Sequence, residues 1–242
     1  ASLYAFSSQS SALTTASPSP KLELKYFGAR GVAETARIIL ALAGEGYTDT
    51  RYEITPGTFE APEFKNAKES GDLDMNMGRA PLLVVDGKTV IGQSKAIERY
   101  LAKTFGLMGE SDIEAAQIDC IAEHCRDIKD AQMKKGFSVF NREKTEEEKA
   151  ELRQDWFENG MPTMLEKLEK AIKLTSQKDS YAVGNKNSYA DIAIFSLLKD
   201  CSDKEDTEEA AKDCSILVAI AERIAEESNV SKWVEERPKT MF

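Results

Sequence analysis

The sequence predicts two domains, a small α/β domain followed by a larger all-helical one. Residues 21–106 alternate between short apolar strands and segments in which apolar residues recur at helical spacing. Two of these strands, residues 82–85 and 89–91, are joined by Asp86-Gly87, a strong hairpin signal. Beyond Gly109 no strand pattern appears. We therefore expect a mixed sheet with helices packed on it, and then helices alone.

The first elements are a strand and a helix. Apolar residues at Leu22, Leu24 and Tyr26 alternate with charged ones, which is typical of a strand with one buried face. The helix after them has apolar residues on one face and is ended by glycines. These residues are Ala36, Ile39, Leu40 and Ala43, followed by Gly44 and Gly46.

A short second strand is predicted at residues 50–54. Residues 56–78 contain several prolines and glycines and no clear period, so they are predicted to form a long loop. The hairpin is followed by a helix that starts at Ser94. Its apolar face carries Ile97, Tyr100 and Leu101.

The second domain is predicted to contain helices at residues 111–137, 145–175, 188–201, 207–228 and 230–237. We place the α/β domain at residues 21–104 and the helical domain at 111–242. Residues 1–20 carry no charge and are rich in Ser, Thr and Ala, so we leave them out of the fold. They are either a flexible tail or the remnant of an organellar, plastid-type targeting segment.

Composition excludes some classes of function. The formal charge of −10 disfavours nucleic acid as a partner, because a phosphate backbone is repelled by such a surface. No apolar run approaches the roughly 18 residues that span a bilayer, so membrane insertion is not expected. The cysteines lack C-x-x-C spacing, which favours free buried thiols and leaves a disulfide open. They are Cys120, Cys125, Cys201 and Cys214.

His124 is the only histidine, and on a helix it lies one turn from both Cys120 and Asp127. That spacing could supply metal ligands, but no second cluster of ligands accompanies it, so no metal site is expected. One histidine offers no Ser-His-Asp arrangement, and no glycine-rich phosphate-binding motif is present.

Four stretches, taken together, resemble the glutathione S-transferases of the cytosolic type, and most closely their sigma (prostaglandin-D-synthase-like) class. They are LKYFGARGVAETAR, APLLVVDGKTVIGQSKAIERYLA, GNKNSYADIAIF and VSKWVEERPKT. Their order and spacing match from about residue 21 to the end. The resemblance implies a thioredoxin-like, glutathione-binding N-terminal domain, an all-α C-terminal domain and a homodimer. It also implies a cytoplasmic location, beside the organellar alternative raised by residues 1–20.

Tyr26 is the catalytic residue that this resemblance implies. In the family, a tyrosine at the end of the first strand donates its hydroxyl proton to the sulfur of glutathione. A free thiol with a pKa of about 8.5 is only a few per cent thiolate at pH 7, and a hydrogen bond to the thiolate lowers that pKa. Glutathione, the cosubstrate, then supplies the nucleophile. The plainer alternative is a half-buried aromatic residue at a strand end.

The resemblance also implies residues that bind glutathione. Pro81 matches the family's cis-proline, which presents the backbone of Ala80 to the cysteinyl part of the tripeptide. Gln93 and Ser94 match the pair that holds the γ-glutamyl end. Ser94 is also expected to cap the following helix, whose free N–H groups attract a carboxylate.

Three further positions are assigned in the same way. Lys65 is the expected partner of the glycyl carboxylate, and Arg79 stands where lysine or glutamine is usual. Asp127 matches the residue that reaches across the dimer interface to the amino group of glutathione. Ser188 and Asp191, within NSYAD, match a helix-capping box and have a structural role only.

The chain departs from the family pattern at three places. Val32 follows Arg30-Gly31 where a second arginine is often found. Ala61 replaces a loop tryptophan, and residues 66–77 resemble an insertion. These departures put the affinity for glutathione in doubt.

The sequence leaves three functions open. The first is transfer of glutathione to a small hydrophobic electrophile, in a pocket with Met133, Phe137 and Phe140 on one wall. The second is isomerisation by the same thiolate. The third is a non-catalytic scaffold or lens-type protein, which the departures favour and the retained binding residues disfavour.

Overall fold

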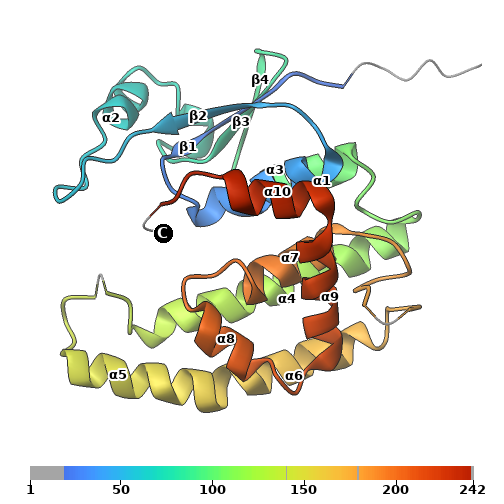
Figure 1. Cartoon of the computed structure of the whole chain (residues 1–242). Helices are drawn as coiled ribbons and strands as arrows, with labels where there is room; N and C mark the ends of the chain where they lie inside the picture. The colour runs from blue at the N-terminus through green and yellow to red at the C-terminus, as the bar shows by residue number, and fades with distance from the viewer. Residues whose placement is uncertain (1–18, 140, 179, 241–242) are drawn as a thin grey trace, which may run out of the picture.

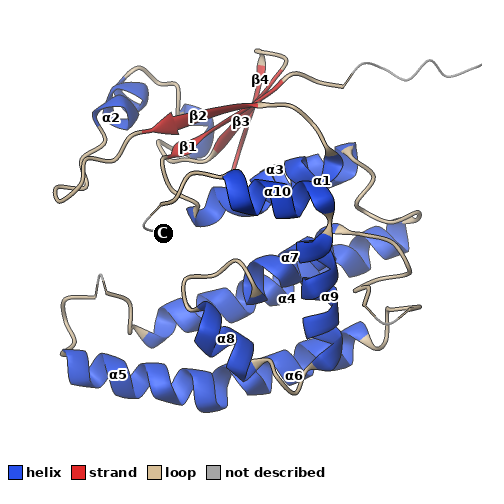
Figure 2. Cartoon of the chain, in the orientation of Figure 1, coloured by secondary structure: helices blue, strands red, loops and turns tan. Residues whose placement is uncertain are grey.

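The computed structural model describes residues 19–139, 141–178 and 180–240. Its first part is a thioredoxin-like α/β domain, as predicted (Figure 1, Figure 2). The strands are β1 (Leu22–Phe27), β2 (Thr48–Tyr52), β3 (Leu82–Val85) and β4 (Thr89–Gly92). They form one sheet in the order β2-β1-β3-β4. Strand β1 is parallel to β2 and antiparallel to β3, and β3 pairs with β4 as the predicted hairpin.

Helices α1 (Glu34–Ala43) and α3 (Ser94–Thr104) pack together below this sheet in Figure 1. Helix α1 ends where the glycine pattern predicts, because Gly44 takes a left-handed conformation (φ 69°) and its N–H caps the last turn. The second strand starts and ends two residues earlier than predicted. Its last residue, Tyr52, is buried, and this burial sets its register against β1.

The prediction of a structureless loop at residues 56–78 is wrong. This stretch contains α2 (Pro62–Glu69) and a short 3-10 turn, Asp74–Asn76. No residue of α2 is buried, so the helix has no continuous apolar stripe that the sequence could reveal. Its partly buried Phe64 and Ala67 pack against a small cluster of buried residues, and the Phe64 ring centroid lies 4.7 Å from that of Phe27.

The second part of the chain is all-helical. Its helices are α4 (Asp112–Lys135), α5 (Glu146–Asp155), α6 (Met161–Ile172), α7 (Tyr189–Leu198), α8 (Lys204–Ala210), α9 (Ser215–Glu226) and α10 (Ser228–Glu236). Among the described residues, no helix combines the length and apolar character that crossing a bilayer requires.

Two predicted helices are interrupted. The helix expected at 145–175 contains a π-helical turn, Trp156–Gly160, between α5 and α6. Pro162 follows it and cannot donate to the helix ladder, and a Cβ on Gly160 would lie 2.7 Å from the Trp156 ring. The helix expected at 207–228 is two helices, α8 and α9, because the Glu169 carboxylate of α6 accepts the N–H of Ile216 at 3.0 Å and fixes a new helix start there.

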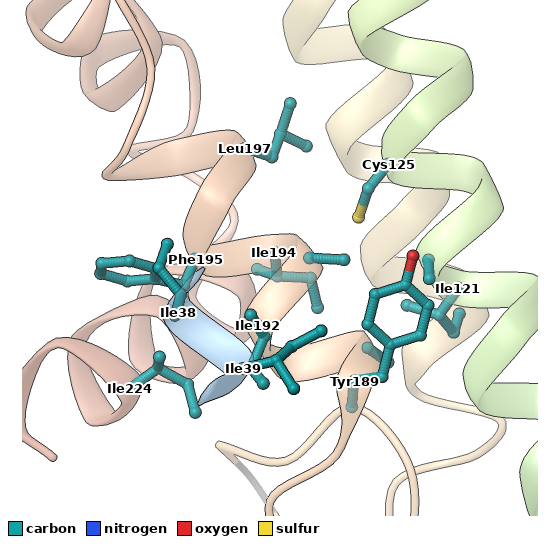
Figure 3. Close-up of a cluster of buried hydrophobic side chains, with 14 of the residues drawn as sticks. Ile38, Ile39, Ile121, Cys125, Tyr189, Ile192, Ile194, Phe195, Leu197 and Ile224 are labelled. Carbon is teal, nitrogen blue, oxygen red and sulfur yellow. The ribbon is translucent and has the colours of Figure 1, made fainter. Parts of the chain in front are cut away.

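Helix α7 is the centre of the molecule, and all of its residues are buried. Its N-terminus has the predicted capping box, in which the Asp191 carboxylate accepts the N–H of Ser188 at 2.9 Å. Figure 3 shows the apolar cluster around it, with Ile38 and Ile39 from α1 and Ile121 from α4. One apolar core therefore continues from the sheet domain into the helical domain.

The end of the chain returns to the first domain. Helix α10 packs on α1 (Figure 1). The Trp233 indole N–H and an Arg237 N–H each donate to one Glu34 carboxylate oxygen at 2.8 Å. Arg237 also donates to Asp200, at 2.6 Å. These contacts fix the angle at which the two domains meet, and that angle shapes the space between them.

Candidate active site

Tyr26 lies near the end of β1, half-buried, with its hydroxyl against the turn that follows the strand. A Cβ on Gly31 would lie 2.6 Å from the Tyr26 hydroxyl oxygen, and the φ of Gly31 is +43°. Only glycine permits this approach. The glycine of the Arg30-Gly31 pair thus allows the backbone to close over the phenol.

A buried arginine also lies near the phenol ring. The guanidinium carbon of Arg37 is 6.0 Å from the Tyr26 ring centroid. Arg37 is held in place by Glu34 at 3.1 Å and by the Ala29 carbonyl at 2.8 Å. Its positive charge therefore lies close to the tyrosine and is fixed there by the fold.

An interdomain cleft of about 520 Å³ passes the same turn. Gly31, Val32, Gln93 and Ser94 line it from the sheet domain. The helical domain lines it with α4, the end of α7 and the segment after it. The side chain of Tyr26 is not part of the lining, but Gly31, which its hydroxyl contacts, is. The segment predicted to be an insertion, 66–77, does not line this cleft, so it does not obstruct it.

Gln93 and Ser94 are at the N-terminus of α3. Gln93 is the N-cap residue with φ +67°, and no side chain caps the helix. The prediction that Ser94 caps the helix is therefore wrong, because Ser94 is already inside its first turn. The N–H groups of that turn are left without a side-chain acceptor, and such groups favour an anion.

The peptide bond between Ala80 and Pro81 is cis, as predicted. Pro81 is buried at the start of β3, while Ala80 is half-exposed. Ala80 is thus partly exposed just before β3, an inner strand of the sheet, where the tripeptide is expected.

Asn76, which the sequence did not single out, joins the two segments that carry Pro81 and Gln93. It is 4% exposed, its amide donates to the Pro81 carbonyl at 3.0 Å, and its Oδ1 accepts the Gln93 N–H at 3.2 Å. Its backbone carbonyl also accepts the N–H of Arg79 at 3.1 Å. The only sequence signal for Asn76 was that it is a polar residue two positions before Gly78, in a stretch with no clear pattern.

Besides Tyr26, Ala80 and Pro81, three more of the predicted residues are not part of the cleft lining. Lys65 is exposed on α2, with Nζ 3.9 Å from Glu69. Arg79 is exposed beside Asn76. Asp127 is exposed on α4 and does not line the cleft, although its neighbours Arg126 and Asp130 do. Their roles in glutathione binding stay predictions.

The expected pocket wall is partly wrong. Met133 lines the cleft and is 76% exposed. Phe137 packs instead against Phe157, with ring centroids 6.0 Å apart, because the chain turns away at Gly136 after α4 ends. Phe140 lies outside the described residues. Val32 lines the cleft and is 54% exposed, so the position at which the family often has a second arginine is open to a ligand.

The four cysteines are free thiols. Cys120 is exposed, contrary to the prediction that all four are buried, and its sulfur is 3.5 Å from Nε2 of His124. Cys125 is buried beside the cleft, and burial raises the pKa of its thiol to about 12. Over the described part of the chain, no three His, Cys, Asp or Glu side chains are grouped as metal ligands.

Comparisons with known proteins agree with the resemblance in the sequence. The family model described as "Glutathione S-transferase, N-terminal domain" matches residues 22–103, and the corresponding C-terminal domain model matches residues 131–237. Glutathione S-transferase 1 of Ascaris suum is 32% identical over 229 residues, covering 92% of this chain and 100% of that protein.

Two further relatives span the same length. S-crystallin SL11 of Nototodarus sloanii is 27% identical over 223 residues, covering 92% of this chain and 100% of its own. The solved structure of a Nu-class glutathione S-transferase from Haemonchus contortus superposes with a TM-score of 0.75 at 28% identity. That match covers 92% of this chain and 100% of the other.

Proposed function

The chain belongs to the glutathione S-transferase superfamily, and from this premise we propose that it is a transferase in which Tyr26 activates the thiol of glutathione. The observation that carries the proposal is the contact between the Tyr26 hydroxyl and Gly31, a residue of the cleft wall. A tripeptide lying along that turn would bring its sulfur within reach of the phenol.

The remaining residues support this placement. Gln93 and the uncapped start of α3 suit the γ-glutamyl end, whose carboxylate is favoured by free helix N–H groups. The backbone of Ala80, before the cis bond, suits the cysteinyl part. Asp127, exposed on α4, would complete the site of a second copy in a homodimer.

The chemistry requires one proton and two electron pairs to move. Glutathione releases its thiol proton to the solvent on binding, and the Tyr26 O–H donates a hydrogen bond to the thiolate and keeps it anionic near pH 7. The sulfur then attacks an electrophilic carbon and forms the S–C bond, while the leaving group departs with its electron pair. Apolar residues of the cleft, Val32, Met133 and Leu197, suit an acceptor with a hydrophobic body.

Two alternatives share this architecture. An isomerase would use the same thiolate on a different acceptor. A non-catalytic role is favoured by two observations, the full-length similarity to an S-crystallin and the presence of Val32 where a cation is often found.

The test uses glutathione-agarose binding and conjugation of 1-chloro-2,4-dinitrobenzene. Tyr26→Phe should lower kcat/KM by 10- to 1,000-fold, on the order of 1.4–4 kcal/mol, and shift the pH dependence of the rate upward. Tyr100→Phe is the matched control, since it removes the hydroxyl of another half-buried tyrosine, on α3, that is neither part of the cleft lining nor among the groups nearest Gly31. If the wild-type protein neither binds nor conjugates, the non-catalytic alternative holds. If it conjugates and both variants match it, Tyr26 is not the activating group.

A further inference from the structure

One cation in the interdomain cleft has no carboxylate partner. Lys129 is half-buried on α4 and lines the cleft. Its Nζ donates to the Ser196 carbonyl at 3.0 Å, and no carboxylate oxygen of the described residues lies within 4.0 Å of it. An ammonium group has three N–H donors, and this contact uses one of them.

The other cations of the cleft are already paired. Each of the remaining cations holds a carboxylate: Arg30 holds Asp200, Lys95 holds Glu98, and Arg126 holds Glu123. The carboxylates Glu34, Asp200 and Asp203 all accept from arginines. Lys129 is thus the cation in this cleft that remains available to a ligand.

Asp130 is the one cleft carboxylate without an ion pair among the described residues. It adjoins Lys129 in sequence but lies beyond the 4.0 Å limit of an ion pair with it, because successive side chains on a helix point in different directions. It therefore does not neutralise the ammonium group directly.

The surroundings of Lys129 make an unpaired charge unfavourable. Burial, with a smaller contribution from the positive charge of Lys95, lowers the pKa of the Lys129 amine. Ala122, Ala193 and Leu197 line the same cleft and offer no polar partner. A ligand anion beside the ammonium group would compensate for the lost hydration.

A purely structural role of Lys129 explains only part of its placement. Ser196 lies in the last turn of α7, where carbonyl groups lack helical partners and a lysine is favourable. Such a cap accounts for one N–H bond. It does not require the amine to face the same cleft as Gly31 and Gln93.

We propose that Lys129 makes the acceptor site selective for electrophiles that carry a carboxylate on an apolar body. The proposal rests on the proposed function, because the acceptor must lie beside bound glutathione. The apolar body would contact Val32 and Leu197, and the carboxylate would bind the two N–H groups that Ser196 leaves free.

The test compares two acceptors, 4-(chloromethyl)benzoate and its methyl ester, which differ in charge and by one methyl group. With either one, the glutathione sulfur bonds to the benzylic carbon and chloride leaves with the C–Cl electron pair. Lys129→Gln keeps an N–H donor for the Ser196 carbonyl and removes the charge. It should lower the acid-to-ester ratio of kcat/KM by roughly 10- to 100-fold, the strength of a charge-assisted hydrogen bond. Lys129→Arg should retain most of the ratio.

Lys167→Met is the control, since Lys167 is exposed on α6 outside the cleft lining and should leave the ratio unchanged. The proposal is overturned if Lys129→Gln leaves the ratio unchanged, or lowers the rates with both acceptors equally, as a helix cap would. Circular dichroism and thermal unfolding report whether each variant is folded. If Lys129→Gln does not fold, the binding of the charged and uncharged glutathione conjugates to the wild-type protein, measured by calorimetry, decides the question.

Calorimetry separates failure of this proposal from failure of the proposed function. S-(4-carboxybenzyl)glutathione should bind the wild-type protein more tightly than its methyl ester, and raising the salt concentration should reduce the difference. Equal binding of the two conjugates refutes the role of Lys129 and leaves the transferase function standing. Binding of neither conjugate refutes both.

Discussion

Replacing Asn76 with alanine should weaken glutathione binding, although the tripeptide need not contact Asn76. Its side chain holds the Pro81 carbonyl at 3.0 Å and the Gln93 N–H at 3.2 Å, so one buried amide sets the distance between two predicted binding segments. Without it, each segment can relax independently, and the ligand must order both of them.

The magnitude follows from the environment of each contact. Pro81 is buried, so its unpaired carbonyl costs about 1–3 kcal/mol, whereas exposed Gln93 can exchange its partner for water at a cost of about 1 kcal/mol or less. We expect the free energy of unfolding to fall by about 1–4 kcal/mol in total. The KM for glutathione should rise on the order of 10-fold, equivalent to about 1.4 kcal/mol, while the KM for the acceptor changes little.

The assay combines urea denaturation with steady-state kinetics in which each substrate is varied in turn. Asn76→Asp keeps an acceptor for the Gln93 N–H but cannot donate to Pro81, so it isolates one contact. Leu168→Ala is the control for stability, because Leu168 is buried in the helical domain and its truncation costs about 2–5 kcal/mol. The reasoning is refuted if Asn76→Ala and Leu168→Ala lose similar stability and the KM for glutathione is unchanged in both.

Three further predictions concern the phenol, the capping box and the thiols. Gly31→Ala should displace the Tyr26 hydroxyl, given the 2.6 Å approach, and lower the conjugation rate at least 10-fold; unchanged kinetics would contradict the contact. Asp191→Ala should lower the free energy of unfolding by about 3–5 kcal/mol in urea, because the Arg223 guanidinium at 2.6 Å loses its buried partner; a loss under 1 kcal/mol would argue against the network. With Ellman's reagent at pH 8, exposed Cys120 should react quickly. Burial raises the pKa of Cys125 to about 12 and keeps it protonated, so Cys125 should react only after denaturation.

The sequence was sufficient for the elements that its periodicity and turn chemistry encode. The first strand, the Gly44 stop of α1, the Asp86-Gly87 hairpin and the Ser188 capping box all depend on residues close together in the chain. Local interactions of this kind leave a pattern in a short window, which is why they could be predicted.

Elements fixed by distant contacts could not be predicted in this way. Helix α2 buries no residue and is anchored through Phe64, so it carries no apolar period. Helix α9 starts where Glu169 of α6 caps it. Phe137 does not line the cleft because it packs against Phe157. In each case the deciding partner is at least 20 residues away in the chain.

The same distinction between local and distant contacts applies to the candidate site. The sequence by itself determined the residue types at the strand end, at the cis-proline and at the start of α3, through motifs that span a few residues each. Only the tertiary structure decided that Asn76 joins two of these motifs and that Lys129 lines the cleft with no carboxylate oxygen of the described residues within 4.0 Å. The physical reason is that hydrogen bonding and charge pairing are properties of groups brought together by the packing of two domains, and no local pattern records them.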